Sequence, residues 1–265
     1  MSVISIPRLP DQINVNFGPA DAIADVVLAT DRAARNAGIR LSLSTDFDEL
    51  KRVNRANRVD WYALTPNFDP EHSALGAENA FWVKGIDHKG DVVLCHAVRL
   101  YAIHNATLAD ELESLRLFYD SPAQALTAGV SMRATAEVAH RMNGRMTFSG
   151  GLWVRSDYRG GGLARLIPPL SRAVALTRWY PAFHVCVVSR EKLEKGMGAV
   201  YGYGSVDYSV WLLKVPGFGD ALECGLCWMT TAEAEAEVEE RALRLNKSVG
   251  IGLERQSGNQ IHGVA

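Results

Sequence analysis

The sequence predicts an α/β protein with a mixed β-sheet, and three features of the chain support this prediction. Residues 81–103 contain two strand patterns around a turn signal, which is typical of an antiparallel hairpin. An apolar strand at 147–154, a helical pattern at 163–178 and a continuously apolar strand at 182–188 form a crossover that joins parallel strands. Because continuous apolarity suits a strand covered on both sides, we expect helices on both faces of the sheet. Three glycines at 160–162 lie at the start of the crossover helix.

The other expected elements follow from periodicity, capping residues and breakers. In chain order they are a helix over 21–37, a strand over 39–44, a helix after the N-cap Asp46, a loop over 58–80, a helix over 105–119, a helical pattern over 123–141 that is broken by Gly129, a short helix over 189–197, a strand over 208–215, an edge strand over 221–229 and a helix from Thr230 to about residue 245. We expect one main domain over 39–216, an N-terminal extension over 1–38, and a C-terminal appendage over 217–265.

The composition favours a small ligand over a polymer or a membrane. The 265 residues carry 28 basic and 30 acidic side chains, so charge gives no reason to expect a nucleic-acid or membrane partner. Neither a leader pattern nor an apolar run of spanning length is seen, and a cytoplasmic location is the expectation. Cys224 and Cys227 form a lone C-x-x-C without a second ligand pair, so no metal is expected.

The glycine turn is suited to binding an anion. Successive glycines let main-chain N–H groups converge, and the start of the following helix adds partial positive charge. A Walker loop is excluded because Gly162 is followed by Leu163 and Ala164 rather than by Lys and Ser or Thr. A dinucleotide fingerprint also fits poorly, because Arg165 stands where its third glycine is needed.

The turn matches a third pattern, Arg/Gln-x-x-Gly-x-Gly/Ala directly after a strand, with Arg159, Gly162 and Ala164 at its three positions. In this motif and in the order of its elements, the sequence resembles the GNAT superfamily of N-acetyltransferases over residues 39–215. The resemblance implies a GNAT-like mixed, mostly antiparallel sheet with a splayed parallel pair. It also implies acetyl-CoA as cosubstrate, with its pyrophosphate at the glycine turn.

The resemblance also implies which residues contact the cosubstrate. In the family, the strand before the turn bulges away from its parallel neighbour, and Gly150 and Gly151 would permit such a bulge. The implied cofactor-binding residues are Leu152, Trp153 and Val154 on the strand, and Arg159, Gly160, Gly161, Gly162, Leu163 and Ala164 at the turn.

The proton carriers are less well defined by the sequence. The family often has a carboxylate on the opening strand, but residues 147–154 contain none, which leaves Glu137, Asp157 and His184 as candidates for the base. Tyr201 is the candidate for the acid, although another register places Leu193 there. His96 shares a strand face with apolar residues and is interpreted as a core or cleft-edge histidine.

We therefore expect an acetyl-CoA-dependent N-acetyltransferase that acylates a primary amine of a small molecule or peptide by direct attack. One alternative is another acyl group or acceptor on the same fold. The other is a CoA-binding regulatory protein without catalytic activity, which the missing carboxylate favours. The oligomeric state stays open, with a homodimer as one option.

Overall fold

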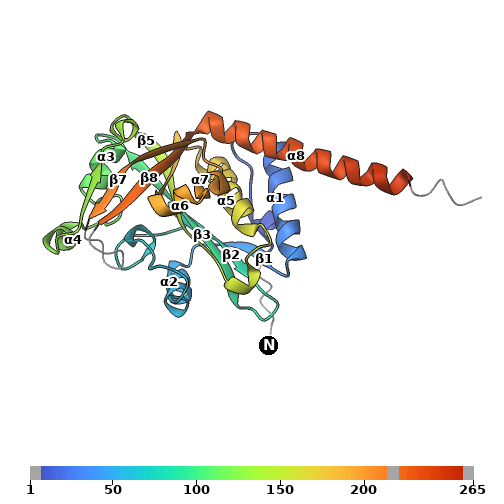
Figure 1. The fold of residues 1–265 in the computed structure, drawn as a ribbon, viewed down its shortest axis with the longest axis horizontal. Coiled ribbons are helices and arrows are strands. Elements are labelled where there is room, and N and C mark those ends of the chain that lie inside the picture. The colour runs from blue at the N-terminus through green and yellow to red at the C-terminus, as the bar shows by residue number, and fades with distance from the viewer. Residues whose placement is uncertain (1–6, 214–220, 259–265) are drawn as a thin grey trace, which may run out of the picture.

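A computed structural model describes residues 7–213 and 221–258, and its centre is one eight-stranded sheet (Figure 1). The strands are β1 Arg40–Ser44, β2 Ala80–Ile86, β3 Val92–Ile103, β4 Ser131–Ala134, β5 Gly144–Val154, β6 Phe183–Ser189, β7 Ser205–Leu213 and β8 Ala221–Thr230. Their order across the sheet is β1-β2-β3-β5-β6-β8-β7-β4. Only β5 and β6 are parallel neighbours; all other neighbours are antiparallel. The predicted fold class is therefore confirmed.

Helices cover both faces of this sheet. On one face, α1 (Ala20–Asn36) and α5 (Leu163–Trp179) pack their apolar stripes on β1, β2, β3 and the end of β5. On the other face, α2 (Phe47–Ala56) and α3 (Leu108–Glu113) enclose a second apolar core with β3, β5 and β6. The sheet therefore separates two cores, one on each of its faces.

The segment between the hairpin and β5 differs from its prediction. A helical pattern interrupted at Gly129 is expected over 123–141, but the chain forms α4 (Ala123–Thr127), β4 and the 3₁₀ turn η3 (Glu137–His140). Gly129, with φ +81°, ends the helix, and Met132 and Ala134 then bury one side of a strand that pairs with β7. Tertiary pairing thus overrides a local helical pattern.

The expected edge position of the last strand is wrong. β8 lies between β6 and β7, and it pairs with β6 from Phe183↔Thr230 to Ser189↔Cys224. The reason is that β7 and β8 form an antiparallel hairpin, and β8 is the strand of this hairpin that is inserted beside β6. The segment expected to be an appendage therefore supplies an interior strand.

The C-terminal helix α8 (Thr231–Gly258) follows β8 directly and runs along α1 before it extends beyond the sheet (Figure 1). Two short helices connect β6 to β7: α6 (Arg190–Glu194) lies within the one short helix expected over 189–197, and α7 (Met197–Tyr201) follows it. The 3₁₀ turn η2 (Pro66–Phe68) lies in the loop before β2. Among the described helices, none combines the length and apolarity needed to cross a bilayer.

Candidate active site

The parallel strands β5 and β6 are joined only at one end. They pair at Met146↔Phe183, Thr147↔His184 and Phe148↔Val185, and no pairing continues although β5 runs on to Val154 and β6 to Ser189. The two strands therefore form a wedge that opens toward their carboxyl ends. Main-chain groups along the open edges are free to bind a ligand or water.

A bulge in β5 lies where the wedge begins. Ala97 of β3 pairs with Gly150 and Cys95 pairs with Trp153, so Gly151 and Leu152 together face His96 alone. Gly151 has φ +63°, and a Cβ on Gly150 would lie 2.9 Å from Cε2 of Phe68. Both positions thus require glycine, one for its backbone angle and one for a close contact. The bulge expected from the glycine pair is present.

The glycine turn follows the η4 turn (Ser156–Tyr158) and leads into α5. Gly160 and Gly162 have φ values of +88° and +79°, and a side chain at either position would point into open space. Within the described ranges, the N–H groups of the three glycines at 160–162 donate to no protein acceptor. The turn therefore presents free donors at a helix N-terminus, which is the arrangement that binds phosphate.

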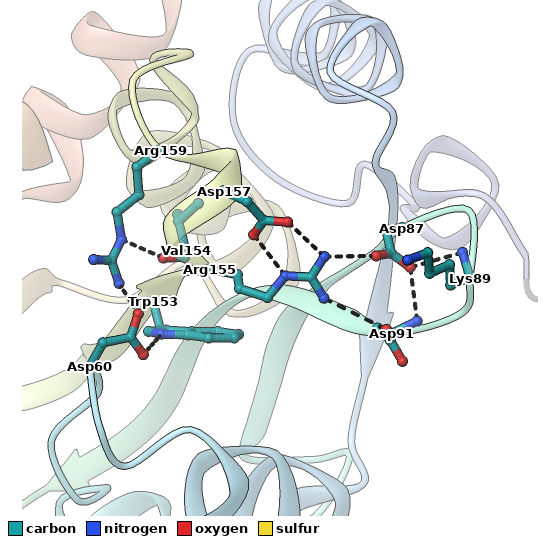
Figure 2. A network of polar contacts seen from close by, with 9 residues as sticks. All are labelled: Asp60, Asp87, Lys89, Asp91, Trp153, Val154, Arg155, Asp157 and Arg159. Carbon is teal, nitrogen blue, oxygen red and sulfur yellow. Dashed lines mark hydrogen bonds and ion pairs between the residues drawn. The ribbon is translucent and has the colours of Figure 1, made fainter.

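The side chain of Arg159 is held away from these donors. Its Nε donates to the carbonyl oxygen of Val154 at 2.7 Å, and its terminal nitrogen pairs with Asp60 at 2.6 Å (Figure 2). Asp60 also accepts a hydrogen bond from Trp153 Nε1 at 3.1 Å. Arg159 thus fastens the loop at Asp60 to the end of β5. A direct contact of its side chain with pyrophosphate would require it to leave Asp60.

A second arginine holds the same strand end from the other side. Arg155 contacts Asp157 at 2.8 Å, Asp87 at 2.9 Å and Asp91 at 3.7 Å (Figure 2). Asp157, a candidate base, is therefore engaged in an ion pair at the turn. Arg165, in contrast, lies exposed in the first turn of α5, with no ion pair within the described ranges.

The wedge opens into a cavity of about 350 Å³. Its walls come from the loop that begins at Trp61, the β5 bulge, the open half of β6, α6, and the segment between β3 and β5. Residues from this last segment are buried and apolar: Leu115, Phe118, Val130 and Met132. The long connection expected to wall a substrate site thus contributes the inner wall of this cavity.

His96 lines the cavity opposite the bulge, and its hydrogen bonds define its tautomer. Its Nδ1 lies 2.8 Å from Ser171 Oγ, and that hydroxyl donates its proton to the Ile167 carbonyl at 2.9 Å. Since a hydroxyl has one proton, Nδ1 must be the donor and Nε2 carries the lone pair. Burial, together with the positive charge of Arg172, lowers the pKa of His96 to about 3 and keeps the ring neutral.

Tyr201 is the one predicted catalytic residue that lines the cavity. It lies at the end of α7, where Arg172 donates to its carbonyl oxygen at 2.8 Å. Burial raises the pKa of the Tyr201 hydroxyl above its usual range. The hydroxyl therefore carries its proton at neutral pH, as a proton donor must.

The other two predicted catalytic residues are not brought to the cavity. Glu137 lies in η3 with a side chain that is 84% exposed and is paired with Arg141 at 3.3 Å. His184 is fully buried in the paired half of β6, where its Nδ1 lies 2.8 Å from Thr147 Oγ1. Burial lowers the pKa of His184 to about 3. The order of the strands predicted His184 close to the gap between β5 and β6. The register of the two strands, however, places His184 in their paired part, before they separate.

The thiols near the cavity are protonated. Cys186 and Cys224 line it, and burial raises the pKa of both. A protonated thiol is a poor nucleophile, so an acyl-enzyme on either cysteine is disfavoured. Within the described ranges, no group of three or more His, Cys, Asp or Glu residues is placed to hold a metal.

Known proteins resemble this chain in structure but not in sequence. No protein-family model matches, and no curated protein matches. Among solved structures, Mycobacterium smegmatis RimJ in complex with CoA-disulfide matches with a TM-score of 0.44 and 15% identity, covering 76% of this chain and 88% of its own. A spermidine N-acetyltransferase from Vibrio cholerae matches with a TM-score of 0.43 and 8% identity, covering 75% and 96%. FeeM, an N-acyl amino acid synthase from uncultured soil microbes, matches with a TM-score of 0.44 and 10% identity, covering 75% of this chain and 94% of its own.

All three TM-scores are below 0.5, so these likenesses carry no argument about the site, which rests on the geometry of this chain alone.

Two parts of the site were not predicted as such. The Asp60 contact joins residues 99 positions apart in the chain, and no local pattern signals it. His96 had a detectable signal, because aligning the hairpin strand antiparallel to β5 places it opposite the bulge at Gly151 and Leu152.

Proposed function

We propose that this protein is a coenzyme A-dependent N-acyltransferase that acylates a primary amine of a small molecule or peptide by direct attack. Acetyl-CoA is the simplest donor for this reaction. The observation that supports the proposal is the combination of a wedge between parallel strands with free main-chain donors at the adjoining turn. An elongated thioester with a pyrophosphate at one end needs both features.

The cosubstrate would use main-chain groups more than side chains. The pyrophosphate would accept from the N–H groups of residues 160–164, and the exposed Arg165 would add a charge-assisted contact. Leu152, Trp153 and Val154 would present strand-edge groups to the pantetheine and the thioester carbonyl. Arg159 would act indirectly, since its contacts with Asp60 and Val154 hold the end of the strand.

The chemistry requires two proton transfers. The amine nitrogen attacks the thioester carbon, so a C–N bond forms and the C–S bond breaks. The amine proton passes to His96 Nε2, directly or through water, and the departing thiolate takes a proton from the Tyr201 hydroxyl. The proton on His96 then passes through water to the Tyr201 oxygen, which restores both residues. The lowered pKa of His96 makes it a weak base, so we expect it to act on the already acidic nitrogen of the tetrahedral intermediate.

The test measures binding and turnover separately. Calorimetry with CoA reports binding, and thiol release from acyl-CoA with a panel of primary amines reports transfer. We expect CoA binding and amine-dependent thiol release. Gly162→Asp should weaken CoA binding, whereas Gly38→Asp, at an open positive-φ position after α1, is the matched control.

The outcomes separate an enzyme from a binding protein. CoA binding without turnover for any amine or acyl chain would support the regulatory alternative. Absence of CoA binding in the folded protein would contradict the proposal altogether.

A further inference from the structure

The cavity beside the wedge differs in polarity between its two ends. At the outer end, Tyr62 is 60% exposed, and Glu191 and Lys192 are exposed charged residues. At the inner end, Leu115, Phe118, Val130, Met132 and Phe148 are all buried and apolar. A substrate that fills the cavity must therefore be polar at one end and apolar at the other.

The cavity as a whole is much larger than an acetyl group requires. The cavity of about 350 Å³ corresponds to roughly a dozen water-sized volumes of ~30 Å³ each. An acetyl group would leave most of the apolar wall in contact with water, and wetting of apolar surface is unfavourable. The cavity thus favours an apolar group with several carbon atoms beyond the carbonyl.

The position of the cavity indicates which substrate carries this group. Phe148 is the last residue of β5 that pairs with β6, and its ring is part of the inner apolar wall. The bulge at Gly151 and Leu152 follows directly, and it also lines the cavity. A thioester carbonyl held at the bulge would therefore direct its acyl chain into the inner end, while the amine enters past Tyr62 and Lys192.

We infer that the acyl donor carries an apolar chain of about six to ten carbons, which fills the inner end of the cavity lined by Phe118, Val130 and Met132. This inference rests on the proposed function, because it assigns the acyl group of the same reaction. The charged outer end would accommodate a polar amine acceptor.

The test compares acyl-CoA donors from two to twelve carbons, by calorimetry and by amine-dependent thiol release. Burying each added methylene should raise affinity up to about fourfold until the inner end is full. Met132→Trp would fill the inner end and should move the preference to acetyl-CoA. Arg133→Trp adds the same bulk to the exposed side of the same short strand and should leave the preference unchanged.

A second measurement keeps the inference separate from the proposed function. A fluorescent fatty-acid analogue should bind the folded wild-type protein and should bind at least tenfold more weakly to Met132→Trp than to Arg133→Trp. If Met132→Trp does not fold, as judged by thermal unfolding, the milder Met132→Phe replaces it.

The results then lead to distinct conclusions. CoA binding with an affinity independent of chain length would overturn the inference and leave the proposed function in place. Displaceable probe binding without any CoA binding would support the apolar site and contradict the proposed function. The inference would also be overturned if the Met132 variants kept the wild-type preference for acyl-chain length and bound the fatty-acid analogue as tightly as the wild-type protein.

Discussion

Strand β6 has two neighbours, and it pairs with them very differently. With β8 it pairs without interruption over seven residues, from Phe183 to Ser189, whereas with β5 it pairs over only three, from Phe183 to Val185. Because β6 is the same strand in both cases, irregularity of β6 cannot explain the gap. The cause lies in β5, which bulges at Gly151 and Leu152 and turns away from its neighbour.

The difference shows where main-chain groups of the sheet lack strand partners and can bind a ligand instead. Unpaired main-chain groups in a protein interior must find partners, and a strand edge facing a cavity offers them to a ligand. On the β8 side, β6 pairs at every position from Phe183 to Ser189, so this part of the sheet has a structural role. On the β5 side, the open groups lie next to the glycine turn and the cavity.

The largest effect is expected from Gly151→Val, which acts on the open side. A β-branched residue is strained at φ +63°, so the bulge should not persist and CoA affinity should fall on the order of 100-fold. Gly38→Val places the same residue at φ +76° after α1, with open space around it. Calorimetry should show normal CoA binding for Gly38→Val despite similar strain, and equal affinity losses would mean that the bulge has no special role.

A similar effect, but on rate rather than binding, is expected from Tyr201→Phe. Loss of a general acid lowers kcat about 100-fold, while CoA affinity should stay within about twofold. Tyr203→Phe is the comparison, because the Tyr203 hydroxyl lies 3.0 Å from Ser149 Oγ and the residue is buried. It should lower stability without a specific loss of kcat. Equal kcat losses for both variants would remove Tyr201 from the mechanism.

A smaller effect is expected from Arg165→Ala at the glycine turn. Loss of one exposed charge near a phosphate should weaken CoA binding about three- to tenfold, and the loss should shrink as salt concentration rises. Arg52→Ala removes an exposed arginine from α2, whose only ion pair in the described chain is the long 3.9 Å contact with Asp46. If both variants bind CoA equally at low and high salt, Arg165 does not contact the ligand.

The smallest effect concerns the paired half of β5 and β6, where His184 contacts Thr147. Burial lowers the pKa of His96 and His184 to about 3, so the unfolded chain takes up their protons first as the pH falls below about 6.5. Stability is therefore complete above that pH and should fall toward pH 3, by about 1.4 kcal/mol per pH unit for each histidine. Urea unfolding between pH 4 and 7 measures how the free energy of unfolding depends on pH. In His184→Leu the slope of this dependence should be about half that of the wild-type protein. An unchanged slope would contradict a neutral His184 in the folded protein.

Local sequence patterns predicted the open side of β6 better than the paired side. Glycine weakens a regular strand or helix, so the glycines at 150, 151, 160 and 162 indicate an irregular backbone at these positions. The bulge and the turn could therefore be predicted from residue type. The interior position of β8 could not, because pairing between 183–189 and 224–230 depends on long-range register that no local pattern encodes.

The candidate site was predictable only in part, for a related reason. The main-chain donors follow from local glycine conformation, but the cavity is assembled from segments far apart in the chain. Met132 was expected on a helix and lies on a strand, while Glu137 was expected near the opening strand and lies in solvent. His96 was correctly placed on a buried face, and its position at the cavity follows only once β3 and β5 are paired.

The central claim is that the gap between β5 and β6 is the binding site of coenzyme A. A crystal structure of the protein with CoA tests it most directly. We predict pyrophosphate against the main-chain N–H groups of residues 160–164, and pantetheine between β5 and β6 beyond the Phe148↔Val185 pair. Pyrophosphate bound elsewhere, or strands that pair past Val185 with CoA outside the gap, would contradict it.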